Sequence, residues 1–150
     1  SGCVKVNEHL LFPGALAHAR RAAKLSQVSL ARALSVDQSY LCGLERGRRG
    51  TPRREVVEQL ATAVAGASAP ATAAELRWAA AHDRVIQTLN EAELAGAASL
   101  VSVVLRAHRR LAPDELAGLA SYMKNLFVSR ERLDRVAGRI PAGPGEEVAM

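Results

Sequence analysis

Residues 25–47 contain two short apolar patterns in succession, and these patterns limit what the chain can fold into. The stretch is LSQVSLARALSVDQSYLCGLERG, and its apolar residues recur three and four positions apart on both sides of Ser35. Each pattern is long enough for only about two helical turns, and helices this short are unstable in water alone. The pair therefore needs further helices to pack against. The residues expected to face such a core are Leu30, Ala31, Leu34, Leu41 and Leu44.

Residues at the expected helix boundaries support this arrangement. Ser26 and Asp37 stand where the two short helices would begin, and both residue types commonly cap helix N-termini. A preceding helix would start at Pro13 and run to about Lys24, and a following helix would open with Thr51 as its cap. The apolar positions of these two flanking helices are Leu16, Ala19, Ala23, Val56, Val57, Leu60 and Val64.

The composition of the 150-residue chain favours helices throughout. Apolar residues make up 49% of it but aromatic residues only 3%, and β-branched residues are never strung together in alternation. We therefore predict an all-α protein. No run approaches the roughly 18 apolar residues of a membrane span, so we expect a cytoplasmic protein that does not bind membranes.

A small, uncharged segment, AGASAPA at residues 65–71, separates two helical regions. Its Gly and Pro residues indicate a connection between them. We expect a first domain over residues 10–66, a linker over 67–71 and a helical region over 72–139. The remaining residues, 140–150, lack periodicity and are expected to form a disordered tail.

Three helices are expected in the second region, over about 72–89, 91–110 and 113–137. In the last of them, apolar residues recur at alternating spacings of three and four, which is typical of a narrow packing seam. Such a seam needs a partner, either a second chain or the preceding helix of a monomeric bundle. We favour a homodimer formed by this helical hairpin or small bundle, because three helices of mostly Ala, Leu and Val form a thin core. The residues of this dimerisation seam, which only Arg130 interrupts, are Leu116, Leu119, Met123, Leu126 and Leu133.

Positive charge is concentrated in the first region. Residues 1–66 carry ten Lys and Arg against five Asp and Glu, whereas residues 67–150 carry ten of each. The net charge of +5 therefore lies entirely in the first region, and five Arg residues fall within RGRRGTPRR at 46–54. Such a cluster favours binding of a polyanion, although a solvated basic loop has the same composition.

The pattern of residues 10–66 resembles the XRE family, the helix-turn-helix domains related to the Cro and repressor proteins of lambdoid phages. The matching residues are Leu25-Ser26-Gln27, Leu30-Ala31, Leu34, Val36, Ser39-Tyr40-Leu41 and Leu44-Glu45-Arg46-Gly47. The resemblance implies a lambda-repressor-like domain of four to five helices, whose second short helix enters the DNA major groove. Two positions depart from the family pattern. Ser35 replaces the usual Gly of the turn, and Gly43 replaces a long polar side chain that often contacts a base.

The resemblance also implies roles for individual residues on DNA. Gln38 and Ser39 would face base edges, and Gln suits a bidentate contact to adenine. Asp37 would contact a cytosine amine or cap the helix, and Tyr40 would lie against the DNA backbone or cover the helix. The residues implied to contact phosphates or the minor groove are Gln27, Arg46, Arg48, Arg49, Arg53 and Arg54.

The resemblance pairs Arg20 with Glu45 in a structural ion pair that ties the first helix to the end of the third. Removing one partner of such a pair, where it is buried, costs about 3 to 5 kcal/mol because the other charge is left unpaired. Neither residue is therefore assigned to DNA.

Other classes of site find little support in the sequence. The four His residues are scattered, and we find no phosphate-binding Gly loop and no nucleophile motif, so we expect neither an enzyme nor a cofactor. Cys3 and Cys42 have no neighbours at zinc-site spacing. Reduced thiols are expected, with a redox-sensing pair as the alternative.

We therefore expect a sequence-specific regulator of transcription, a repressor that binds an inverted-repeat operator in double-stranded DNA as a homodimer. The resemblance places it in the bacterial cytoplasm, associated with the nucleoid. Two alternatives remain open. One is an antitoxin that represses its own operon and binds a toxin through the C-terminal helices, and the other is a regulator with a small-molecule effector bound between those helices.

Overall fold

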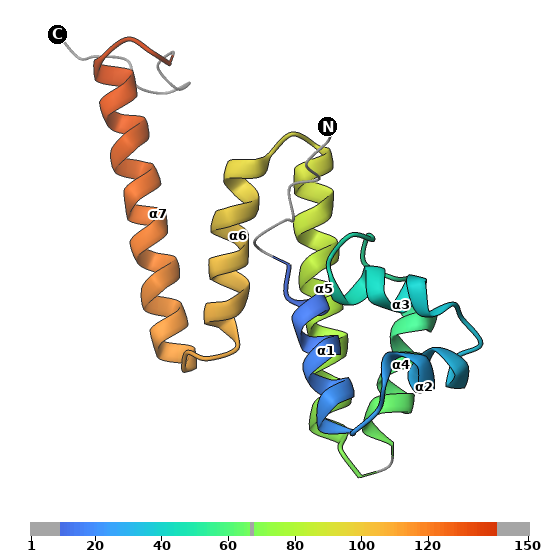
Figure 1. Cartoon of the computed structure of the whole chain (residues 1–150). Helices are drawn as coiled ribbons and strands as arrows, with labels where there is room; N and C mark the ends of the chain where they lie inside the picture. Colours follow the sequence, from blue (N-terminus) through green and yellow to red (C-terminus); the bar gives the residue numbers. More distant parts are fainter. Residues whose placement is uncertain (1–9, 67, 141–150) are drawn as a thin grey trace, which may run out of the picture. The chain divides into compact units, whose positions relative to one another are not determined.

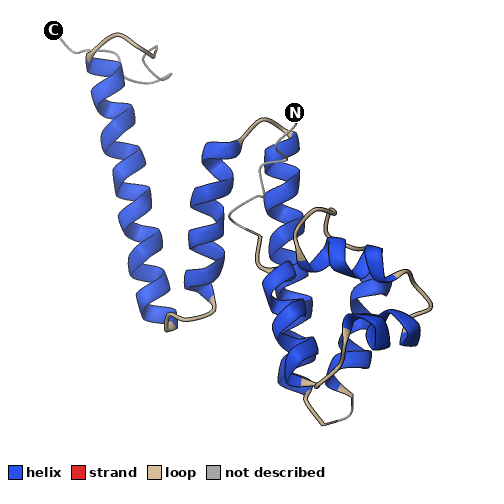
Figure 2. Ribbon diagram, in the orientation of Figure 1, coloured by secondary structure: helices blue, strands red, loops and turns tan. Residues whose placement is uncertain are grey.

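The computed structural model describes residues 10–66 and 68–140, and all regular structure among them is helical (Figure 1). Figure 2 shows these helices joined by loops, which confirms the all-α prediction. Within the same residues no helix is long and apolar enough to cross a membrane. The tail predicted over 140–150 lies outside the described residues except for Ile140. The helices are α1 (Phe12–Ala22), α2 (Gln27–Ala33), α3 (Gln38–Glu45), α4 (Arg54–Ala65), α5 (Pro70–Glu91), α6 (Ala95–His108) and α7 (Pro113–Val136).

Each of the first three helices has the residue expected from the sequence at its start, but only one of the two expected capping hydrogen bonds is formed. Pro13 lies in the first turn of α1, where its missing N–H costs nothing. The Ser26 hydroxyl caps α2 by accepting a hydrogen bond from the Ser29 N–H at 3.0 Å. Asp37 stands at the N-cap of α3, but its side chain makes no capping hydrogen bond, so the predicted cap is wrong in this respect.

The fourth helix begins at Arg54, with Arg53 at its N-cap, and the predicted start at Thr51 is therefore wrong. Helix α5 holds the preceding residues in the loop instead. The Thr51 N–H donates to Gln87 Oε1 at 3.2 Å, and Arg84 Nη2 donates to the Pro52 carbonyl at 2.9 Å. These contacts come from residues more than 30 positions away in sequence, so the local Thr-Pro signal did not reveal them.

The turn between α2 and α3 requires a left-handed residue, which is Ser35 with φ of +54°. Gly adopts this conformation without the steric cost that a side chain brings, which explains why Gly is usual at this position of the resembled family. Ser35 fills the same turn at the cost of some backbone strain.

A single apolar core joins the first five helices. Each contributes one fully buried leucine, and α5 packs against both α4 and α1. The compact unit that contains these five helices extends to Leu105. The five leucines are Leu16, Leu30, Leu41, Leu60 and Leu76.

Asp83 of α5 fixes the start of α1. Its carboxylate accepts hydrogen bonds from the backbone N–H groups of Leu11 and Phe12 at 2.9 and 2.8 Å, which satisfies donors that a helix N-terminus leaves unpaired. His82 Nδ1 lies 2.8 Å from the same carboxylate, and His82 Nε2 lies 2.9 Å from Ser102 Oγ of α6. All three side chains are buried, and the network joins α1, α5 and α6.

The second compact unit begins at Arg106 and contains α7. Helix α7 has no buried residue, although several of its apolar side chains are large. In the predicted seam, Leu126 and Leu133 are exposed and the other three residues are half-buried. Charged residues on α7 pair along the helix, as Arg130 does with Asp134 at 3.2 Å.

We predict that Asp83→Ala lowers the free energy of unfolding by about 3 kcal/mol or more, because it leaves buried donors on the backbone and on His82 without an acceptor. Urea unfolding followed by circular dichroism measures the change. Glu91→Ala, at the exposed end of α5, is the control and is expected to change stability by no more than about 0.5 kcal/mol. Equal effects of the two substitutions would contradict the role given to Asp83.

Candidate nucleic-acid interface

The third helix, α3, has one face buried in the core and the other exposed. Leu41 and Leu44 are buried in the core, whereas Gln38 and Ser39 are exposed in the first turn. A helix of eight residues offers little stability of its own, so these two leucines and the contacts at its C-terminal end hold it in place.

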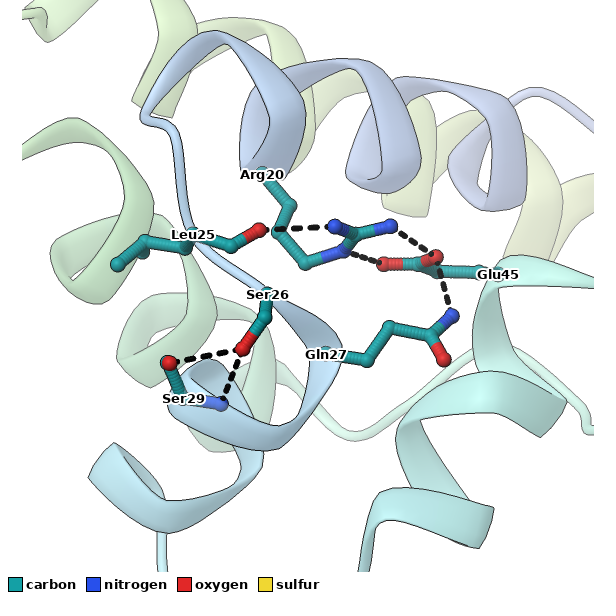
Figure 3. Close-up of polar contacts among 6 residues, drawn as sticks. All are labelled: Arg20, Leu25, Ser26, Gln27, Ser29 and Glu45. Atoms are coloured by element: carbon teal, nitrogen blue, oxygen red, sulfur yellow. Dashed lines mark hydrogen bonds and ion pairs between the residues drawn. The ribbon is translucent and has the colours of Figure 1, made fainter.

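The predicted pair of Arg20 and Glu45 is formed, and it ties the end of α3 to α1 (Figure 3). Arg20 Nε donates to Glu45 Oε1 at 2.6 Å and Nη2 donates to Oε2 at 3.0 Å, the two-point geometry in which Arg binds carboxylates most strongly. Arg20 Nη1 also donates to the Leu25 carbonyl at 2.8 Å. The side chains of Arg20 and Glu45 are only 12% and 6% exposed, so the pair is a structural element of the domain.

Gln27, which the sequence predicts to contact a phosphate, also takes part in the network of Arg20 and Glu45. Its Nε2 atom donates to Glu45 Oε2 at 2.7 Å (Figure 3). A Gln amide carries two N–H donors, so one remains for a phosphate. The structure thus gives Gln27 a positioning role that the sequence did not indicate.

The surroundings of Glu45 favour its charged form. Burial raises the pKa of this carboxyl, but hydrogen bonds from Arg20 and Gln27, together with the charges of Arg20 and Arg21, lower it by more. The pKa of Glu45 therefore lies below its ordinary value of 4.5. A carboxylate whose pKa is lower in the folded state stabilises the fold above its ordinary pKa and loses that contribution in acid.

The arginines after α3 form an exposed basic loop beside the helix. All five side chains are exposed, and the contacts of Arg84 and Gln87 with Pro52 and Thr51 hold the loop against α5. The loop residues predicted to contact DNA are Arg46, Arg48, Arg49, Arg53 and Arg54, the last two at the start of α4.

The two remaining predicted site residues, Asp37 and Tyr40, differ in their surroundings. Asp37 is exposed, and its side chain makes no capping hydrogen bond. Tyr40 is half-buried and packs against the core, and the Arg49 guanidinium lies over its ring at 5.1 Å from the centroid. Tyr40 therefore covers part of the helix, which is the alternative role predicted for it from the sequence.

The residues of α5 that hold α1 and the loop were missed at the sequence level. Their signal is the position of polar residues on an otherwise apolar stripe, because Asp83 and Gln87 continue the spacing of Leu76 and Ala80. Polar residues on a core-facing stripe need partners, and here the partners are backbone groups of distant segments.

Among the described residues, no group of three or more His, Cys, Asp or Glu side chains is gathered in a way that could hold a metal ion. Cys42 is a half-buried free thiol on α3. Cys3 lies outside the described residues, so the pair proposed for redox sensing is not placed.

We predict that Glu45→Gln lowers the free energy of unfolding at pH 7 by about 3 kcal/mol, because Arg20 is left without its counter-charge. The wild-type advantage is complete above the ordinary glutamate pKa of 4.5 and shrinks as the pH falls through the lower pKa of the folded state. Urea titrations from neutral pH into acid follow both proteins, with exposed Glu91→Gln as the control. A stability gap that stays constant into acid would show that the Glu45 charge is not its source.

Residues 14–76 match the model of a family described as a helix-turn-helix domain. The match includes α2 to α4 and ends at Leu76, the buried leucine of α5, which agrees with the place of α5 in the core. No significant match was found among curated proteins or among solved structures. The anchored α3, the left-handed turn before it and the family match lead to one conclusion: residues 14–76 of this chain form a helix-turn-helix domain, a type of domain that binds DNA.

Proposed function

We propose that the protein is a sequence-specific transcription regulator of the XRE type, a repressor that binds an inverted repeat in double-stranded DNA as a homodimer. The main observation in support of this proposal is the way in which the rest of the domain holds α3 in place. Its inner face is buried, its C-terminal end is held by Arg20 through Glu45, and its first turn is exposed beside a basic loop. A helix so held can enter the major groove without rearrangement.

In this proposal the exposed residues divide into two groups. Gln38 and Ser39 contact base edges, with Asp37 accepting from a cytosine amine, because these side chains project from the first turn of α3. The basic side chains that contact phosphates give affinity without sequence preference. This second group consists of Arg46, Arg48, Arg53 and Arg54, with the remaining amide N–H of Gln27.

An enzymatic role is not proposed, even though Ser102, His82 and Asp83 have the composition of a hydrolase triad. Ser102 and His82 are each 2% exposed and Asp83 is fully buried, so no substrate reaches the hydroxyl. The Asp83 carboxylate is also occupied by two backbone N–H groups. This network fits a structural role.

We predict that duplexes selected from a random library bind the full chain more tightly than unselected DNA, and that log Kobs falls against log salt with a slope of roughly −0.9 per neutralised phosphate. Gln38→Ala should reduce discrimination between the two DNAs, whereas Arg48→Ala should weaken both alike. Gel-shift titrations at several salt concentrations measure both effects. Equal affinity of the wild type for selected and random DNA would refute a sequence-specific regulator.

Helix α7 supports the homodimer. It carries a seam of regularly spaced apolar residues yet has no buried residue, and a second copy of the same seam would cover it. A two-fold dimer would present two copies of α3 to half-sites about 34 Å apart, or separated by another whole number of DNA turns. An antitoxin would use the same apolar residues to bind a toxin, and an effector-binding regulator would enclose a ligand beside them, so the state of the isolated chain distinguishes these alternatives.

We predict that the isolated protein sediments as a dimer and that Leu126→Glu, within the seam, shifts it to monomer at micromolar concentration. The cause would be burial of a charge in an apolar interface. Ser121→Glu, on the opposite side of α7, is the matched control and should leave the dimer intact. Analytical ultracentrifugation reports the mass, and a monomeric wild type would favour the antitoxin or a self-contained bundle.

A further inference from the structure

Gly43 leaves a gap on the outer side of α3, and Arg49 fills it. A Cβ atom at residue 43 would lie 3.1 Å from Arg49 Cγ and 3.2 Å from Arg49 Nε. Arg49 therefore returns from the basic loop and lies directly on the helix at this point. Gly in a helix interior is unfavourable by about 1 kcal/mol relative to Ala, and here the missing side chain makes room for another residue.

Tyr40 holds the other end of the Arg49 side chain. The guanidinium carbon lies 5.1 Å from the centroid of the Tyr40 ring, within the range of a cation–π contact. Tyr40 and Gly43 are three residues apart in α3, so they form neighbouring positions on one side of the helix. Arg49 is thus held along α3 by two contacts, although it belongs to the loop.

Arg49 also lies near the residues already proposed to contact bases. A surface hollow of about 410 Å³ is lined by Asp37, Ser39, Tyr40 and Arg49 among others. The guanidinium therefore shares a surface with Asp37 and Ser39, the side that the proposed function directs into the major groove.

We infer that Arg49 is a specificity-determining residue that contacts a guanine in the major groove, taking the place of the long side chain that Gly43 lacks. Arg presents paired N–H donors that match the O6 and N7 acceptors of guanine, and it keeps its charge at any physiological pH. Its position on Tyr40 and Gly43 orders the side chain before DNA binds, which reduces the entropy lost on binding. This inference rests on the proposed function, and it differs from the phosphate role predicted for Arg49 from the sequence.

Selection of binding sites by the full chain tests the inference. The wild type should select a guanine at one fixed position of each half-site. Arg49→Ala should lose that preference, and its ratio of specific to non-specific affinity should fall by roughly 5- to 150-fold, the range for one bidentate base contact. Arg49→Lys should weaken the preference while keeping affinity for random DNA, because Lys retains the charge without the planar fork.

Three controls separate the outcomes. Arg48→Ala, the neighbouring exposed arginine, should weaken specific and random DNA equally and leave the selected sequence unchanged. Replacing the selected guanine by 7-deazaguanine, which lacks N7, should weaken binding by the wild type but not by Arg49→Ala. Gly43→Gln should reduce the guanine preference without lowering the melting temperature, because the new side chain displaces Arg49 and removes a helix glycine.

Two results would overturn different parts of the proposal. If Arg49→Ala weakens all DNA alike and selects the same sequence as the wild type, Arg49 is a phosphate contact and only this inference fails. If the wild type selects no sequence, the proposed function fails and the inference fails with it.

Discussion

The helix-turn-helix domain depends on Asp83, a buried carboxylate from a helix beyond the expected domain end. Its two hydrogen bonds to Leu11 and Phe12 hold the start of α1, and α1 carries Arg20, which holds the end of α3 through Glu45. The position of α3 is therefore set by a chain of polar contacts that begins in α5. A buried carboxylate is costly unless fully paired, and here two backbone donors and His82 pair it.

Helix α5 also holds the basic loop of the candidate nucleic-acid interface. Arg84 and Gln87 bind Pro52 and Thr51, so the residues between α3 and α4 are fixed on one side by α5 and on the other by the end of α3. One helix thus positions both the support of α3 and the loop that carries the arginines. The exposed pair of Arg77 with Glu58 adds a further link between α5 and α4, of small energetic value because both side chains are close to half exposed.

Local sequence patterns were sufficient to predict the presence of the helices and many of the buried residues. The spacing of Leu30, Leu41 and Leu60 placed these residues correctly, because the apolar face of an amphipathic helix follows from spacing alone. The pairing of Arg20 with Glu45 followed from family resemblance. Contacts over long sequence separations were not predictable in this way. The Thr51 N–H binds Gln87 of α5, and the Arg49 side chain lies across Gly43 of α3, and no local pattern around Thr51 or Arg49 indicates either contact.

The dependence of α1 on Asp83 has a consequence for synthesis of the chain. A ribosome that has released residues up to 66 has already made the whole of α1 to α4, yet neither the buried side chain of Leu76 nor the carboxylate of Asp83 is available. Domains form as units while the chain emerges, and this unit closes only when α5 is present. The nascent protein therefore acquires a fixed α3 only after α5 has been translated.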